Sequence, residues 1–125
     1  MSMTKTYVSV LAVIISSILC MQCSNSSTPP MEIVGVWTTP DENYAGESIE
    51  FTSGMIIMNS VSRGVFEYTI DKVKSKEGHL YNSTLYTVYY TDQSGEKNLL
   101  NLIYTPEEGG TLMFKSEQDI FWKRI

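Results

Sequence analysis

Glycine-containing turns interrupt the chain every eight to twelve residues from Glu32 onward, and β-branched and aromatic runs fill the intervals. This spacing is typical of all-β domains, because tight turns between antiparallel strands need residues that accept a positive φ. No stretch competes with it by repeating apolar residues at helical spacing. The pattern predicts an all-β domain over residues 32–125 with eight strands, at about 33–38, 47–52, 55–60, 64–74, 79–91, 97–105, 110–115 and 119–125.

Alternation of apolar and polar residues indicates which side of two strands faces inward. Ile49 and Phe51 alternate with polar residues in one strand, and Phe66, Tyr68 and Ile70 do so in another. Short turns make neighbours in sequence neighbours in space, and closing the sheet removes edges that would otherwise promote aggregation. We therefore expect a small eight-stranded antiparallel up-and-down β-barrel.

An apolar segment precedes this domain. Residues 1–6 carry one basic side chain, Lys5, and no acidic one, and residues 7–21 are apolar apart from serines. Fifteen helical residues rise about 22 Å, which is short of the roughly 30 Å hydrocarbon core of a bilayer. Residues 1–22 are therefore interpreted as a signal peptide whose apolar region spans 7–21, and export is expected.

The two cysteines of the chain, Cys20 and Cys23, lie at the end of that segment. The segment resembles a bacterial lipoprotein signal, because the polar tract SNSSTPP follows Cys23 directly. The resemblance implies that Cys23 carries the palmitate-type lipid, with Cys20 as the alternative, since Gln22 stands where such signals have a small residue. We expect an acylated cysteine and flexible linker over 23–31, and a lipid-anchored protein of the cell envelope, periplasmic or surface-facing.

The charge balance narrows the classes of partner. Eight basic and fourteen acidic residues follow residue 22, which leaves a net charge of −6 on the processed chain. No run of lysine or arginine is present. Nucleic acids and anionic headgroups require a basic patch, so the sequence argues against both as partners and leaves the lipid anchor as the link to the membrane.

The first and last predicted strands carry a family resemblance. The Gly35-Val36-Trp37 triplet and the closing Ile120-Phe121-Trp122-Lys123-Arg124 are similar to motifs of the lipocalin-like (calycin) barrels found among small bacterial lipoproteins. The resemblance implies that Trp37 closes the barrel floor, that Gly35 permits close strand approach, and that Arg124 packs across the indole, with Lys123 as the alternative. The Thr-Asp-x-x-Tyr element of classical lipocalins is absent.

Residues with catalytic or metal-binding chemistry are sparse. The one histidine, His79, follows a glycine at the start of a predicted strand, and the acidic pairs Asp41-Glu42 and Glu107-Glu108 fall in turns. No nucleophile elbow, phosphate loop or zinc motif is present, and no loop offers the spaced oxygens that Ca²⁺ needs. We expect no enzymatic activity, no metal and no cofactor.

Tyrosines form the densest aromatic group of the chain, and two interpretations remain open for them. They are either core residues paired across strands or the lining of a small lumen for an apolar or glycan ligand, and the residues concerned are Tyr86, Tyr89, Tyr90 and Tyr104. The sequence thus predicts a non-enzymatic envelope lipoprotein whose barrel binds a hydrophobic or other small ligand. The alternative is a protein-interaction module that resembles the lysozyme-inhibitor lipoproteins, which an acidic surface would suit.

Overall fold

The structure is a computed structural model that describes residues 23–77 and 82–125. The expected signal peptide, Cys20 and His79 lie outside the described residues. The strands are β1 (Cys23–Ser26), β2 (Gly35–Thr38), β3 (Ser48–Phe51), β4 (Met55–Ser60), β5 (Gly64–Glu77), β6 (Thr84–Thr91), β7 (Lys97–Thr105), β8 (Thr111–Phe114) and β9 (Glu117–Arg124). Two short 3-10 helices, η1 (Glu42–Tyr44) and η2 (Glu107–Gly109), lie in connections. None of the helices among the described residues has the length and apolar character to cross a membrane.

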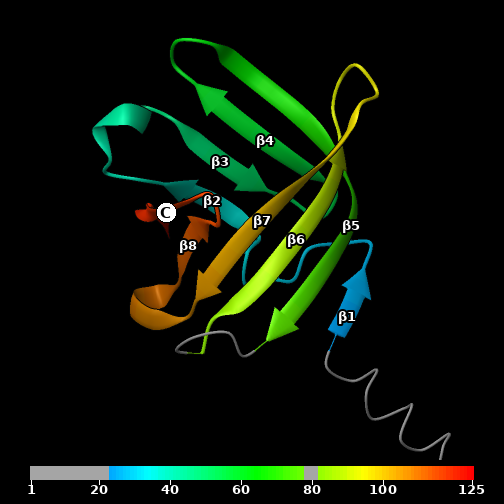
Figure 1. Cartoon of the computed structure of the whole chain (residues 1–125). Helices are drawn as coiled ribbons and strands as arrows, with labels where there is room; N and C mark the ends of the chain where they lie inside the picture. The colour runs from blue at the N-terminus through cyan, green and yellow to red at the C-terminus, as the bar shows by residue number, and fades with distance from the viewer. Residues whose placement is uncertain (1–22, 78–81) are drawn as a thin grey trace, which may run out of the picture.

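Eight of the strands close into an antiparallel barrel, which confirms the fold class predicted from the sequence (Figure 1). Consecutive strands from β2 to β9 pair with one another, and β9 returns to pair with β2 through Trp37–Arg124 and Thr38–Lys123. A shift in the β5–β6 register between Ile70 and Lys72 bends the long strand β5, as bulges do where a sheet must curve.

The first strand, β1, departs from the linker that we expected over residues 23–31. Strand β5 is 14 residues long, and β4 covers only its first part, from Gly64 to Thr69. The free edge beyond Thr69 presents unpaired backbone groups, and β1 pairs there with residues 73–76. Part of the expected linker is therefore a strand of the sheet, because backbone hydrogen bonding does not depend on the polar composition of the segment.

The barrel interior is the hydrophobic core, and its residues alternate along the strands as predicted. Ile49 and Phe51 in β3 and Ile70 in β5 are buried, and Phe66 and Tyr68 are partly buried beside them. The largest fully buried side chains come from strands all around the ring and from the segment before it: Trp37, Trp122, Phe51, Ile33, Ile56, Leu102, Leu112 and Val88.

The two ends of the barrel differ in what covers them. We call the end that carries η1 and the β4–β5, β6–β7 and β8–β9 turns the mouth, and the end that carries η2 and the start of β2 the floor. Figure 1 shows the β4–β5 and β6–β7 connections at one end and the η2 connection at the other. Strand β1 lies beside the part of β5 that runs toward the floor (Figure 1).

Candidate ligand site at the mouth of the barrel

The structure brings together the three residues expected at the floor. The Trp37 ring is fully buried, and the guanidinium carbon of Arg124 lies 4.9 Å from the ring centroid. The φ of Gly35 is +138°, and a Cβ placed there would lie 3.3 Å from Cδ of Arg124, so glycine permits the close approach of the two strands. The indole Nε1 of Trp37 donates to the carbonyl oxygen of Ile33 at 2.9 Å, and Arg124 donates to the carbonyl oxygen of Glu32.

Trp37, the largest side chain of the floor, is therefore closely packed, and its one hydrogen-bond donor is paired. Tyr104 lies edge-on against Trp37, with ring centroids 6.5 Å apart and an interplanar angle of 85°. The floor therefore stabilises the fold. The Nε1 of Trp37 is not available to a ligand, because it already donates to Ile33.

The four tyrosines proposed as a ligand lining do not form one site. Tyr86 is buried in the core, Tyr104 belongs to the floor, and Tyr90 contacts the Tyr68 ring at a centroid distance of 5.1 Å. Tyr89 lies on the opposite face of β6, outside the barrel, as period-2 alternation requires. The four side chains therefore do not surround one lumen, because adjacent residues of a strand point to opposite faces.

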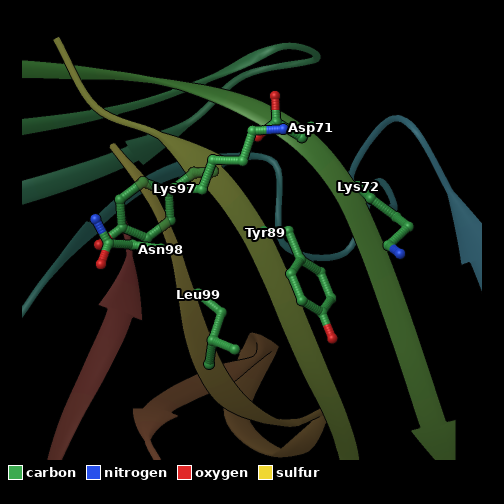
Figure 2. A pocket seen from close by; sticks show the side chains of 7 residues that line it. Asp71, Lys72, Tyr89, Lys97, Asn98 and Leu99 are labelled. Carbon is green, nitrogen blue, oxygen red and sulfur yellow. The ribbon is translucent and has the colours of Figure 1, made fainter. Parts of the chain in front are cut away.

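Tyr89 borders an open hollow on the outer surface, which Figure 2 shows and whose lining also includes Tyr90. Lys72 on β5, Tyr89 on β6 and Leu99 on β7 are directly paired across the three strands. The hollow has a volume of about 670 Å³, and two of its polar groups, Asp71 and Lys72, already have partners. Thr91 donates to Asp71 at 2.6 Å, and the Lys72 ammonium lies 4.8 Å from the centroid of the Tyr89 ring.

A second hollow enters the barrel at the mouth and has a volume of about 290 Å³. Its deeper lining is aromatic and apolar, and its entrance is polar, with Glu47, Ser60 and Arg63. The apolar and aromatic lining residues come from η1, β3, β4, β5, β8 and β9: Tyr44, Ile49, Met58, Phe66, Tyr68, Phe114 and Trp122. This combination of an apolar wall with a few polar groups is typical of small-molecule sites.

Trp122 carries the one feature of this mouth pocket that is chemically incomplete. Its side chain is 2% exposed, and Nε1 is the one buried side-chain nitrogen or oxygen without a hydrogen-bond partner in the described part of the chain. A buried donor without an acceptor costs about 1 to 3 kcal/mol. An acceptor supplied by a bound molecule would remove that cost.

The neighbours of Trp122 hold its ring in place. The Tyr44 ring lies 5.5 Å from it and the Phe114 ring 5.7 Å, measured between centroids. The Tyr44 hydroxyl donates to both carboxylate oxygens of Glu117, at 2.7 and 2.8 Å, and thereby ties η1 to β9. This hydrogen bond, followed by burial, raises the pKa of Tyr44 to about 12.

The polar entrance of the mouth pocket is satisfied by internal contacts. The Ser60 hydroxyl donates to Glu47 at 3.1 Å, and the Arg63 guanidinium lies 3.6 Å from the same carboxylate. Glu47 and Arg63 therefore compensate one another, and the free hydrogen-bonding capacity lies deeper, at Trp122.

Sequence reasoning did not select Trp122, Tyr44 or Glu117 as site residues. Alternation of Ile120 and Trp122 along the last strand could have placed Trp122 inside the barrel. The lack of an acceptor for Nε1 depends on residues from several strands, so no local pattern announces it.

The remaining sequence-based expectations concern the anchor and metals. Cys23 is the first residue of β1 and is paired with Lys76. Within the described residues, no group of three or more His, Cys, Asp or Glu side chains is placed to hold a metal ion.

Comparisons with protein-family models, curated proteins and solved structures found no match for this chain. The closed antiparallel ring of eight strands is consistent with a calycin-like fold.

Proposed function

We propose that this chain is a non-enzymatic binding protein of the bacterial cell envelope whose barrel holds a small, mainly apolar molecule with one hydrogen-bond acceptor. The observation that carries the proposal is that Trp122 lines the mouth pocket and that its buried Nε1 has no hydrogen-bond partner. A native fold rarely keeps a buried donor unpaired, and such a group calls for a functional explanation.

The size of the pocket limits the ligand class. A volume of about 290 Å³ lies just below the range of roughly 300 to 1,000 Å³ for ligand pockets. The ligand is therefore smaller than a fatty acid of full length, and a single ring with a carbonyl or ether oxygen matches the apolar wall and the indole donor.

Two small aromatic probes of the same shape test this proposal. Acetophenone carries a carbonyl oxygen, and α-methylstyrene carries a methylene group in its place. We expect acetophenone to bind about tenfold more tightly, because a hydrogen bond to a buried donor contributes roughly 1 to 1.5 kcal/mol. Isothermal titration of both probes measures the ratio of their Kd values.

The variant Trp122→Phe removes the donor and keeps an aromatic ring at the same position. The tenfold preference should disappear in it, whereas the Trp37→Phe control, whose indole donates to Ile33 instead, should keep the preference. Equal affinities of the two probes for the unmodified protein would contradict the proposed role of Trp122.

A separate experiment tests the proposed lipid anchor at Cys23. Metabolic labelling with an alkyne fatty acid should label the full chain and the Cys20→Ala variant, and the Cys23→Ala variant should stay unlabelled. Label that persists in both single variants, or that is missing from the unmodified chain, would contradict anchoring at Cys23.

A further inference from the structure

A row of lysines lies on the outside of the barrel, although the sequence contains no basic run. Lys72, Lys74 and Lys76 alternate with other residues along β5, so strand geometry places them on one face, and all three are exposed. They are three of the eight basic residues that follow residue 22. We call this row, together with Tyr89, the lysine strip.

Tyr89 gives the strip an aromatic surface as well as a positive one. The ammonium groups of Lys72 and Lys74 lie 4.8 and 5.5 Å from the centroid of its ring. Leu99, paired with Tyr89 on the next strand, is 51% exposed. Tyrosine beside lysine, with an apolar side chain next to both, is the composition that protein surfaces carry at the boundary between bilayer and water.

The strip lies where the chain would enter a membrane. Strand β1 pairs with the second part of β5 and sets Cys23 opposite Lys76 and Asn25 opposite Lys74. In the sequence, Gln22 alone separates Cys23 from the apolar residues 7–21. Whether the chain is held by that segment or by lipid on Cys23, the attachment point is therefore beside the lysine strip.

We propose that the lysine strip docks the barrel against the anionic phospholipid headgroups of the membrane on which the chain is anchored. This inference rests on the proposed anchoring and is independent of the ligand at the mouth. It revises the expectation, drawn from the net charge, that anionic headgroups are not partners. The acidic residues outnumber the basic ones, but within β5 they flank the strip and do not interrupt it: Asp71 precedes Lys72 and Glu77 follows Lys76.

The docked orientation also keeps the mouth pocket accessible. The strip and Cys23 lie toward the floor end of β5, whereas the mouth is at the opposite end of the barrel. A ligand in solution would reach Trp122 without passing the bilayer.

Amine acetylation of the full chain in vesicles tests the docking. The chain is incorporated into vesicles of phosphatidylcholine alone or with phosphatidylglycerol added, and acetylation of each lysine by a water-soluble reagent is followed by mass spectrometry. Each lysine near an anionic surface favours the docked state about fivefold, so three favour it by roughly a hundredfold. We expect the strip lysines to react at least about tenfold more slowly on the anionic vesicles, and salt near 1 M to abolish the difference.

Lys115, in the β8–β9 turn at the mouth, is the internal control and should react equally on both kinds of vesicle. In the Lys74→Glu variant the protection of Lys72 and Lys76 should fall severalfold, whereas Lys115→Glu should leave it unchanged. Equal rates for the strip on both kinds of vesicle, or equal protection of Lys115, would overturn the proposal. Flotation of the vesicles reports anchoring separately, so a chain that floats without protection contradicts docking alone.

Discussion

Replacement of Trp37 by alanine is the strongest test of how the barrel is closed. The side chain is fully buried, its Nε1 donates to Ile33 at 2.9 Å, and its ring packs edge-on against Tyr104. Truncation of a buried tryptophan costs about 3 to 5 kcal/mol, from lost burial and from the cavity left behind. In a domain of this size, a loss of about 1 kcal/mol in the free energy of unfolding lowers the Tm by about 4 to 8 °C. The Tm should therefore fall by at least about 12 °C.

Equilibrium urea unfolding, followed by circular dichroism, gives the change in free energy of unfolding. Phe121→Ala is the matched control, because that aromatic ring is 52% exposed on the outside and its loss should cost less than about 1 kcal/mol. If Trp37→Ala does not fold, Trp37→Phe keeps a ring, loses the hydrogen bond to Ile33 and should cost about 1 to 3 kcal/mol. A loss below about 1 kcal/mol for Trp37→Ala would refute the assignment of Trp37 as the floor of the barrel.

Three further predictions concern other parts of the fold. Gly35→Ala should destabilise the protein by about 1 to 3 kcal/mol in the same urea experiment, because φ is +138° and the new Cβ would press on Arg124; a neutral effect would contradict the described backbone. The pKa of Tyr44 is raised to about 12, so its neutral hydroxyl stabilises the fold below pH 10 and the stabilisation is lost as the pH rises from 10 to 12. Stability measured across that window should fall less in Tyr44→Phe than in the unmodified protein, and identical pH profiles would rule out the Glu117 hydrogen bond as the cause. Hydrogen exchange should show backbone amides of β1 protected by pairing with β5, and exchange as fast as in an unfolded chain would exclude β1 from the sheet.

The architecture was predictable because turns and alternation are local signals. Glycine spacing located β4 and β7 at the residues where they are found, 55–60 and 97–105. The inward side of β3 followed from the alternation of Ile49 and Phe51 with polar neighbours. Each of these signals lies within about ten residues of chain, so a single sequence is enough to detect it.

The candidate site was not predictable, because it depends on which strands meet. Tyr89 and Tyr90 are adjacent in the sequence, yet the ring of Tyr89 lies beside two lysines of β5 whereas the ring of Tyr90 packs against Tyr68. The pairing of β1 with β5 follows from an edge that β4 leaves uncovered, and the unpaired Nε1 of Trp122 follows from neighbours on several strands. Register and packing of this kind join residues that are far apart in the chain.

We propose that the indole of Trp122 offers its unpaired Nε1 donor to a ligand in the mouth of the barrel. The chain has two tryptophans, so the nitrogen–proton correlation spectrum contains two indole signals, and Trp37 is an internal reference because its Nε1 already donates to Ile33. Addition of acetophenone should move the Trp122 indole proton downfield and leave that of Trp37 in place. A titration that moves neither signal, or that moves only Trp37, would contradict the claim.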